Sequence, residues 1–146
     1  MSDIWFQRPT PEELNRVHRD TACEALGIEI TEVGDDYVRG TMPVDKRTVQ
    51  PIGLLHGGAS LLLAETLGSA AAMCTVDRDK WFCVGTTITA NHIRAAAKGP
   101  VLGTAKAIHL GRTSQLWEID IIDPDGKSIC LSRLTTNVVS LDRYKP

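Results

Sequence analysis

One helix limits what this 146-residue chain can fold into. From Gly57 to Val76 the sequence reads GGASLLLAETLGSAAAMCTV, and Glu65 is its only charged residue. A helix that is apolar on nearly every face belongs in the centre of a fold, where other elements cover it. We therefore predict a central helix over about residues 57–75, and its single carboxylate is the first candidate for chemistry.

The segments on either side of this helix are mostly typical of strands. Residues 28–45 carry branched and alternating side chains, which predict two strands joined at Gly34–Asp36. Residues 46–58 contain proline and glycine and predict a loop. After the break at DRDK come four strand-like runs: WFCVGTTITANHI, PVLGTAKAIHL, SQLWEIDIID and SICLSRLTTNVVSL, the last two joined by a DPDG turn. This order predicts an α+β fold with antiparallel strands around one helix.

The N-terminal residues predict a short amphipathic helix that packs on this larger body. In TPEELNRVHRDTACEALG, Thr10 and Glu13 can form a capping box, Pro11 suits the first helical position, and Gly27 is a plausible stop. No repeat, linker or low-complexity stretch divides the chain. We expect one domain over 1–146, with a helical segment at 1–27 and the core at 28–146.

Charge and cysteine usage narrow the function classes. The formal net charge of -2 gives no support to a nucleic-acid or anionic-membrane role. The N-terminus has no apolar signal core and no uninterrupted apolar run approaches a bilayer span, so we expect a cytoplasmic protein. The four cysteines form no CxxC pair and the four histidines are dispersed. We therefore expect buried thiols, and neither a metal nor a cofactor.

Glu65 has a structural and a chemical interpretation. It could emerge at an edge or pair with an arginine, or it could act as a general base or nucleophile. The HGG motif at the helix start favours chemistry, because unshielded amides at the positive end of a helix suit a developing oxyanion. The same glycines could instead permit tight packing. Ser69 lies one turn after Glu65 and could hold a water molecule or simply allow close helix contact.

Helix geometry adds a constraint on any joint action of these groups. Gly57 and Glu65 lie eight residues apart, which is roughly 12 Å along one helix axis. One helix can hardly bring both groups to within about 3 Å of one reacting centre. Two antiparallel copies of the helix could, with the amide from one subunit and the carboxylate from the other. If both groups act together, the spacing predicts a homodimer with shared active sites.

Four segments, QPIGLLHGGASLLLAETLGS, TANHIRAAAKG, AIHLGRTSQLWEIDI and SRLTT, resemble the hotdog-fold acyl-CoA thioesterases. The similarity is to the branch of the 1,4-dihydroxy-2-naphthoyl-CoA and enterobactin-proofreading thioesterases, alongside the PaaI-like enzymes. It spans about Gly34 to Thr136. The hotdog fold, a sheet curled round one long helix, agrees with the order of elements above. The resemblance implies that coenzyme A is part of the substrate and that dimers pair into a homotetramer.

The resemblance also implies roles for individual residues. Glu65 would attack the thioester carbonyl directly or through water, and the N–H of Gly57 would polarise that carbonyl. Gln50 and Ser69 would position water or the acyl group, and His56 would support the loop or the leaving thiolate. Without the resemblance, loop-stabilising hydrogen bonds are the preferred interpretation of His56 and Gln50.

Binding of the polyanionic coenzyme A calls for local basic groups rather than a basic protein. The resemblance implies that the residues around pantetheine and nucleotide are His92, Arg94, His109, Arg112 and Thr113. Gly85 and Gly111 are further candidates for binding substrate or coenzyme A, and Lys98 is a weaker one. Each single Arg or Lys could equally be a solvated surface charge, and His92 could be a packing residue at an interface.

The function that these features favour is hydrolysis of aromatic or medium acyl-CoA thioesters. One alternative is hydration or dehydration of acyl thioesters, whose enzymes carry Asp or Glu and His in strand-loop motifs that this sequence lacks. Another is a non-catalytic acyl-CoA sensor. Such regulators add a DNA-binding segment, whereas this N-terminus supplies one short helix without a basic patch.

Overall fold

The computed structural model describes residues 3–144 and contains the central helix predicted from the sequence. Helix α3 spans Gly57–Cys74, and its buried residues cover most of its circumference, apart from one face on which Glu65, Ser69 and Met73 are only half-buried. By length and composition α3 would pass as a membrane span, which the sequence inspection did not anticipate. However, 61% of it is buried inside this fold, as in the core helix of a soluble protein.

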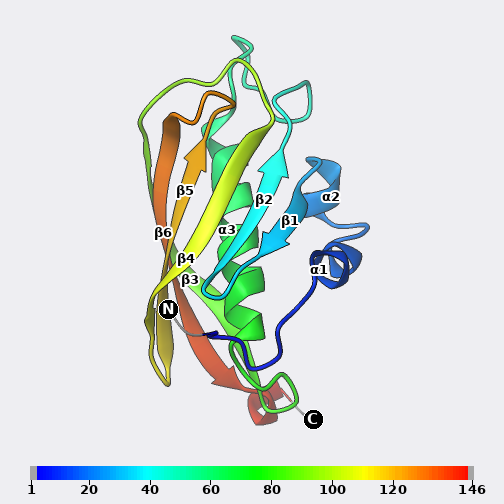
Figure 1. The fold of residues 1–146 in the computed structure, drawn as a ribbon, viewed down its shortest axis with the longest axis vertical. Coiled ribbons are helices and arrows are strands. Elements are labelled where there is room, and N and C mark those ends of the chain that lie inside the picture. The colour runs from blue at the N-terminus through cyan, green and yellow to red at the C-terminus, as the bar shows by residue number, and fades with distance from the viewer. Residues whose placement is uncertain (1–2, 145–146) are drawn as a thin grey trace.

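Six antiparallel strands curl around α3 (Figure 1). They are β1 (Glu29–Val33), β2 (Tyr37–Met42), β3 (Trp81–His92), β4 (Val101–Leu110), β5 (Ser114–Ile122) and β6 (Ser128–Ser140), and a 3-10 turn at Leu141–Tyr144 follows. The sheet order is β1-β2-β4-β5-β6-β3, so β1 and β3 are the two edges. The predicted two strands before the helix and four after it are confirmed, and so is the α+β class.

Close contact between helix and sheet depends on small residues. A Cβ on Gly68 of α3 would lie 2.7 Å from Cδ2 of Leu134, which is fully buried on β6. Where α3 ends, the buried Gln115 of β5 donates from Nε2 to the Thr75 hydroxyl at 2.8 Å. Its Oε1 accepts from the indole N–H of Trp117 at 2.9 Å. These contacts fix both the depth and the end of α3.

The prediction of a single N-terminal helix is wrong, because this segment forms two helices. Helix α1 covers Pro11–Val17 and begins with the predicted capping box at Thr10, whereas α2 covers Ala22–Ala25. Between them Asp20 has a positive φ of 59°, and the Thr21 side chain accepts from the Cys23 N–H to begin α2. The sequence contains a second N-cap inside the segment, and that cap interrupts the helix.

Helix α1 is fixed to the edge of the sheet by one side chain. Asn15 donates from Nδ2 to the carbonyl of Ile30 and accepts from the N–H of Ile30, both at 2.8 Å. The Asn15 amide thus pairs with the edge strand β1 as a neighbouring strand would. Leu14, the buried residue of α1, packs into the core beside it. The last turn of α1 is therefore held beside β1.

Candidate functional site

The structure divides the predicted catalytic residues between two hollows. The first, of about 350 Å³, lies at the N-terminus of α3, and Gln50, Gly57 and His92 line it. The second, of about 510 Å³, lies along the side of α3, and Glu65 and Ser69 line it. We call them the amide hollow and the carboxylate hollow. No described residue lines both, so one copy of the chain does not bring the predicted set together.

The amide hollow is built on the first turn of α3. His56 is the N-cap, and its Nδ1 accepts a hydrogen bond of 2.8 Å from the N–H of Gly58. In this arrangement Nδ1 carries no proton. This N-cap hydrogen bond is of the stabilising kind that the sequence alone favoured for His56, and a role at the leaving thiolate stays a prediction. The N–H of Gly57, also in the first turn, has no acceptor in the part of the chain that the structure describes. A free amide at the positive end of a helix is a donor for an oxyanion.

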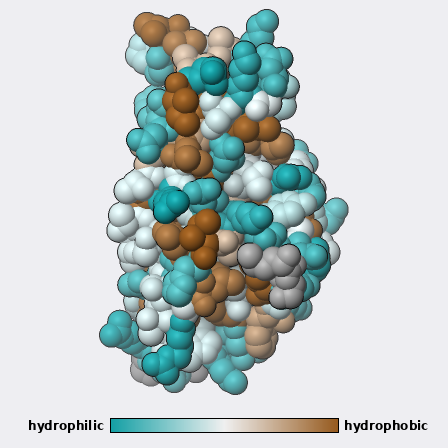
Figure 2. Space-filling view, turned by 60° about the vertical axis from the view of Figure 1, so that its left-hand side comes forward, coloured by the Kyte–Doolittle hydropathy of each residue, from teal (hydrophilic) through white to brown (hydrophobic). Residues whose placement is uncertain are grey.

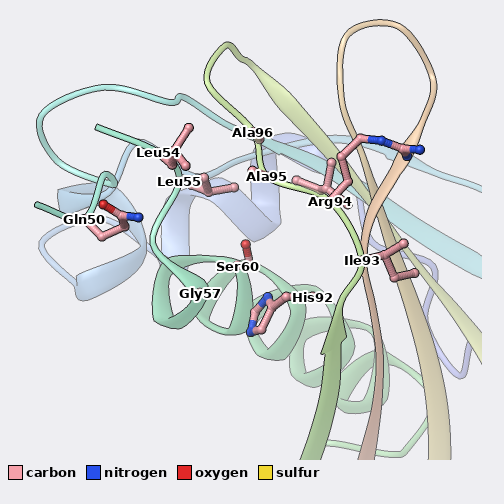
Figure 3. Close-up of a pocket in the computed structure, with 11 residues that line it drawn as sticks. Gln50, Leu54, Leu55, Gly57, Ser60, His92, Ile93, Arg94, Ala95 and Ala96 are labelled. Atoms are coloured by element: carbon pink, nitrogen blue, oxygen red, sulfur yellow. The ribbon is translucent and has the colours of Figure 1, made fainter. Parts of the chain in front are cut away.

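Two further side chains, His92 and Gln50, line the same hollow as this free amide (Figure 3). His92, the last residue of β3, lies so close that a Cβ on Gly57 would be 2.9 Å from the imidazole Nε2. Glycine at 57 is thus required for the imidazole to approach the helix start. Gln50 accepts from the N–H of Ile52 at 2.6 Å through Oε1, and its side-chain NH₂ donates to no described residue. The hollow therefore offers donors from a backbone amide and a side-chain amide.

The carboxylate hollow contains Glu65 in a half-buried position. Glu65 forms no ion pair and no hydrogen bond within residues 3–144, which argues against pairing with a structural arginine. Its carboxylate lies against the edge strand, since a Cβ on Gly85 of β3 would be 2.8 Å from Oε1 of Glu65. Ser69 lines the same hollow one turn later along α3. The hollow thus presents an unpaired carboxylate beside a hydroxyl.

Sequence reasoning missed two features of this hollow. Gly85 was expected to bind substrate or coenzyme A, and its close approach to the Glu65 carboxylate was not anticipated. The N-terminal helices also contribute to the lining, through Leu14, Val17, His18 and Cys23. Neither feature has a local signal, because the residues that meet here lie 20 or more positions apart in the chain.

The predicted coenzyme A residues lie at opposite ends of the sheet. Arg94, just after β3, donates to the carbonyl of Ser128 at 3.1 Å and borders the amide hollow. Arg112 is exposed in the turn before β5 and makes no ion pair with any described residue. The length of β5, nine residues, separates these two ends by about 30 Å. One copy therefore does not bring both arginines to one nucleotide.

The other predicted binding residues divide between these two ends. His109, Gly111 and Thr113 lie with Arg112, and a Cβ on Gly111 would be 2.8 Å from the His109 Nε2. His92 lies with Arg94 at the amide hollow. Lys98 is exposed in the segment after Arg94.

The described residues give no support to metal chemistry or to a nucleophilic thiol. Within residues 3–144 no group of three or more His, Cys, Asp or Glu side chains is placed to hold a metal ion. All four cysteines are free, and Cys74 and Cys130 are buried as expected, while Cys23 and Cys83 are only half-buried. Burial raises the pKa of Cys83 to about 11, so its thiol stays protonated and is a poor nucleophile at neutral pH.

Comparisons with known proteins identify the family to which this chain is similar. A model of the thioesterase superfamily matches residues 52–130, which include α3 and both hollows in part. The chain is 54% identical over 136 residues to the proofreading thioesterase EntH of Cronobacter turicensis, covering 93% of this chain and 98% of that protein. It is 47% identical over 137 residues to the 1,4-dihydroxy-2-naphthoyl-CoA hydrolase of Escherichia coli, covering 93% and 99%.

A solved structure gives the same result for the fold. The crystal structure of a mutant of thioesterase PA1618 from Pseudomonas aeruginosa superposes with a TM-score of 0.94 at 45% identity. That match covers 95% of this chain and all of the other. The curled sheet around one helix is therefore the hotdog fold that the sequence resemblance implied.

Proposed function

The chain belongs to the thioesterase superfamily and is a thioester hydrolase, and we propose that it hydrolyses the coenzyme A thioesters of aromatic or medium-length acyl groups. One observation carries this proposal. An unpaired carboxylate lies in one hollow and an unpaired helix N–H lies in another, and these are the two groups that thioester hydrolysis needs. The named relatives support the substrate class, since one of them is a hydrolase of an aromatic acyl-CoA.

Each group has a defined part in the reaction. The Gly57 N–H and the start of α3 stabilise the negative charge that develops on the thioester oxygen. Glu65 attacks the carbonyl carbon, or removes a proton from the water that does. The C–S bond then breaks, and the thiolate of coenzyme A leaves and takes a proton. After direct attack the acyl group remains on Glu65 as a mixed anhydride, which water hydrolyses to the free acid and the Glu65 carboxylate; after attack by water the acid is released directly. Gln50 and Ser69 orient the water or the acyl group, and both alternatives for Glu65 give the same products.

A second copy of the chain is needed to bring the two groups together. β3 is a 12-residue edge strand whose outer side pairs with no described strand. Open edges of this length are prone to pair with another chain. Exposed apolar side chains, Trp81 and Val84, also lie on it. The space-filling view, turned toward the side of β6, shows apolar groups among the polar surface there (Figure 2). We infer that two β3 strands pair in a homodimer.

Antiparallel pairing of β3 would complete the site. It would place the His92 end of one copy, next to Gly57, beside the Gly85 end of the other, next to Glu65. The Gly57 amide and the Glu65 carboxylate of different copies would then face one thioester. The same pairing would bring Arg94 of one copy toward Arg112 of its partner. One coenzyme A could therefore contact both arginines across the dimer.

The first experiment tests Glu65 itself. Glu65→Gln keeps the size of the side chain but removes its charge, so kcat for a benzoyl-CoA substrate should fall by at least about 10²-fold. Glu29→Gln is the matched control, because Glu29 is exposed on β1 and its side chain makes no hydrogen bond or ion pair with residues 3–144. Near-normal turnover by Glu65→Gln, with circular dichroism unchanged, would remove Glu65 from the mechanism.

A second experiment tests the shared site. Glu65→Ala and Gln50→Ala are refolded together, after each alone is shown to be severely impaired. In a mixed dimer with shared sites, one site contains both substitutions and the other site contains neither. Equal mixing should therefore restore about a quarter of wild-type activity, because about half of the dimers are mixed and each has one intact site of two. Confirmed subunit exchange without recovered activity would rule out shared sites.

A third experiment tests the binding of coenzyme A. Removing the guanidinium in Arg94→Ala or Arg112→Ala should raise KM for acyl-CoA, and should change KM little for an acyl-pantetheine that lacks the nucleotide. Equal losses on both substrates would show that the arginines do not bind the nucleotide end. A panel in which palmitoyl-carrier substrates are the best would refute the acyl assignment.

A further inference from the structure

The carboxylate hollow extends well beyond the two groups that the reaction uses. Apart from Glu65 and Ser69, its wall along α3 is formed by Leu62, Thr66, Ala70, Met73 and Cys74. Its opposite wall comes from the N-terminal helices, through Leu14, Val17, His18 and Cys23. A volume of about 510 Å³ lies within the range of small-molecule sites. Because the hollow begins at Glu65 and is mainly apolar, its natural occupant is the apolar part of the acyl group.

The wall contributed by α1 is held rigidly enough to select a ligand. The two hydrogen bonds between Asn15 and Ile30 fix α1 to β1, as described above. The thiol of Cys23 lies 3.4 Å from the hydroxyl of Thr66, which joins the start of α2 to α3. Val17 is 65% exposed although it is a large apolar residue, and it lines the hollow. An apolar side chain left open at a pocket wall is available for a ligand.

His18 is the exception in this apolar wall. It is half-buried, and its imidazole forms no hydrogen bond with any residue from 3 to 144. Burial lowers the pKa of His18, so the ring is neutral at pH 7, with one nitrogen as donor and the other as acceptor. A partly desolvated polar group gains most from a ligand group that can hydrogen-bond with it. The charged Arg78 also borders the hollow, but it is exposed to solvent.

We propose that the carboxylate hollow is the acyl pocket, and that His18 selects acyl groups that carry a hydroxyl substituent. This inference rests on the proposed function and adds a residue that determines specificity. A hydroxyl suits a neutral imidazole because each can donate and accept. His18 does not touch the reacting carbonyl, so it acts through binding of the distal part of the acyl group.

The experiment compares benzoyl-CoA with 2-, 3- and 4-hydroxybenzoyl-CoA on wild type and three variants. His18→Leu removes hydrogen bonding, and the cap of α1 survives because the backbone N–H of residue 18 makes it. We expect kcat/KM to fall by about tenfold for at least one hydroxybenzoyl-CoA and by less than about twofold for benzoyl-CoA, the size of one lost hydrogen bond. His18→Gln, which can donate and accept, should recover part of the difference. Arg19→Leu, next to His18 but outside the hollow, should leave all four substrates unchanged.

The outcomes separate this inference from the proposed function. If the wild type hydrolyses none of these thioesters, the proposed function fails. If the wild type is active and His18→Leu changes all four substrates by the same factor, the selection of a hydroxyl by His18 fails while the hydrolase assignment stands. The inference would also be overturned if His18→Leu left kcat/KM unchanged for all four substrates.

Discussion

Replacing Gly85 with alanine should reduce catalysis without reducing stability. A Cβ at this position would lie 2.8 Å from the Glu65 Oε1, with Cδ1 of Leu134 next at 3.5 Å. The second distance is ordinary contact, so only the carboxylate must move. It must retreat by about 0.6 Å to reach a normal separation of 3.4 Å. The carboxylate is the free end of a flexible side chain, so the shift costs the fold little.

The catalytic cost follows from the size of this shift. A misplacement of 1 Å in a reacting group can cost about 10²-fold in rate, so a shift of 0.6 Å should lower kcat by about 15-fold. The backbone of Gly85 does not have a positive φ, and alanine lowers the entropy of the unfolded chain. The midpoint of thermal unfolding should therefore stay the same or rise slightly.

Gly68→Ala is the matched control for Gly85→Ala. Its new Cβ would lie 2.7 Å from Cδ2 of Leu134, a similar overlap, but Leu134 is fully buried and has no room to move. Overpacking of this kind costs about 1–3 kcal/mol in the free energy of unfolding. We expect this variant to lose stability, measured by urea unfolding, and to retain more activity per folded molecule than Gly85→Ala.

The assay is steady-state hydrolysis of benzoyl-CoA, followed by release of the free thiol, beside thermal unfolding of each variant. One outcome would contradict this reasoning: Glu65→Gln is inactive, but Gly85→Ala keeps the wild-type kcat. The carboxylate would then not react from its position against β3. A large loss of stability in Gly85→Ala would refute the argument that only the carboxylate must move.

Three further perturbations test the scaffold around the site. Gln115→Leu leaves the indole N–H of Trp117 without an acceptor, so urea unfolding should show a loss of about 1–3 kcal/mol. Asn15→Leu removes both hydrogen bonds to Ile30 and frees α1, so limited proteolysis should cut the N-terminal segment faster while the core stays intact. The pKa of Cys83 is raised from 9.0 to about 11 in the folded state, so its contribution to stability is present below pH 9 and is lost as the pH rises to about 11. The free energy of unfolding should therefore fall over that range, less steeply in Cys83→Ala.

The elements of this fold follow from local patterns in the sequence. The apolar run from Gly57 to Cys74 has no polar face, so it had to become the central helix. The alternating runs on both sides had to become strands, because the period of side chains along a strand is two. The separation of Gly57 from Glu65 also follows from helix rise alone, and so does the need for two copies if both act on one carbonyl. These features depend on residues that are neighbours in the chain.

The environment of Glu65 was decided only in the tertiary structure. β3 reaches the Glu65 carboxylate because it pairs with β6, and the open edge beyond it exists because β3 pairs with no other described strand. The other wall of the hollow depends on Thr21, which begins α2, and on Asn15, which attaches α1 to β1. Periodicity cannot predict such contacts, because they join residues that are distant in the chain and depend on how closely whole elements pack. The sequence by itself thus determined a buried helix with one carboxylate, and the packing of β3 and α1 against that helix decided what the carboxylate faces.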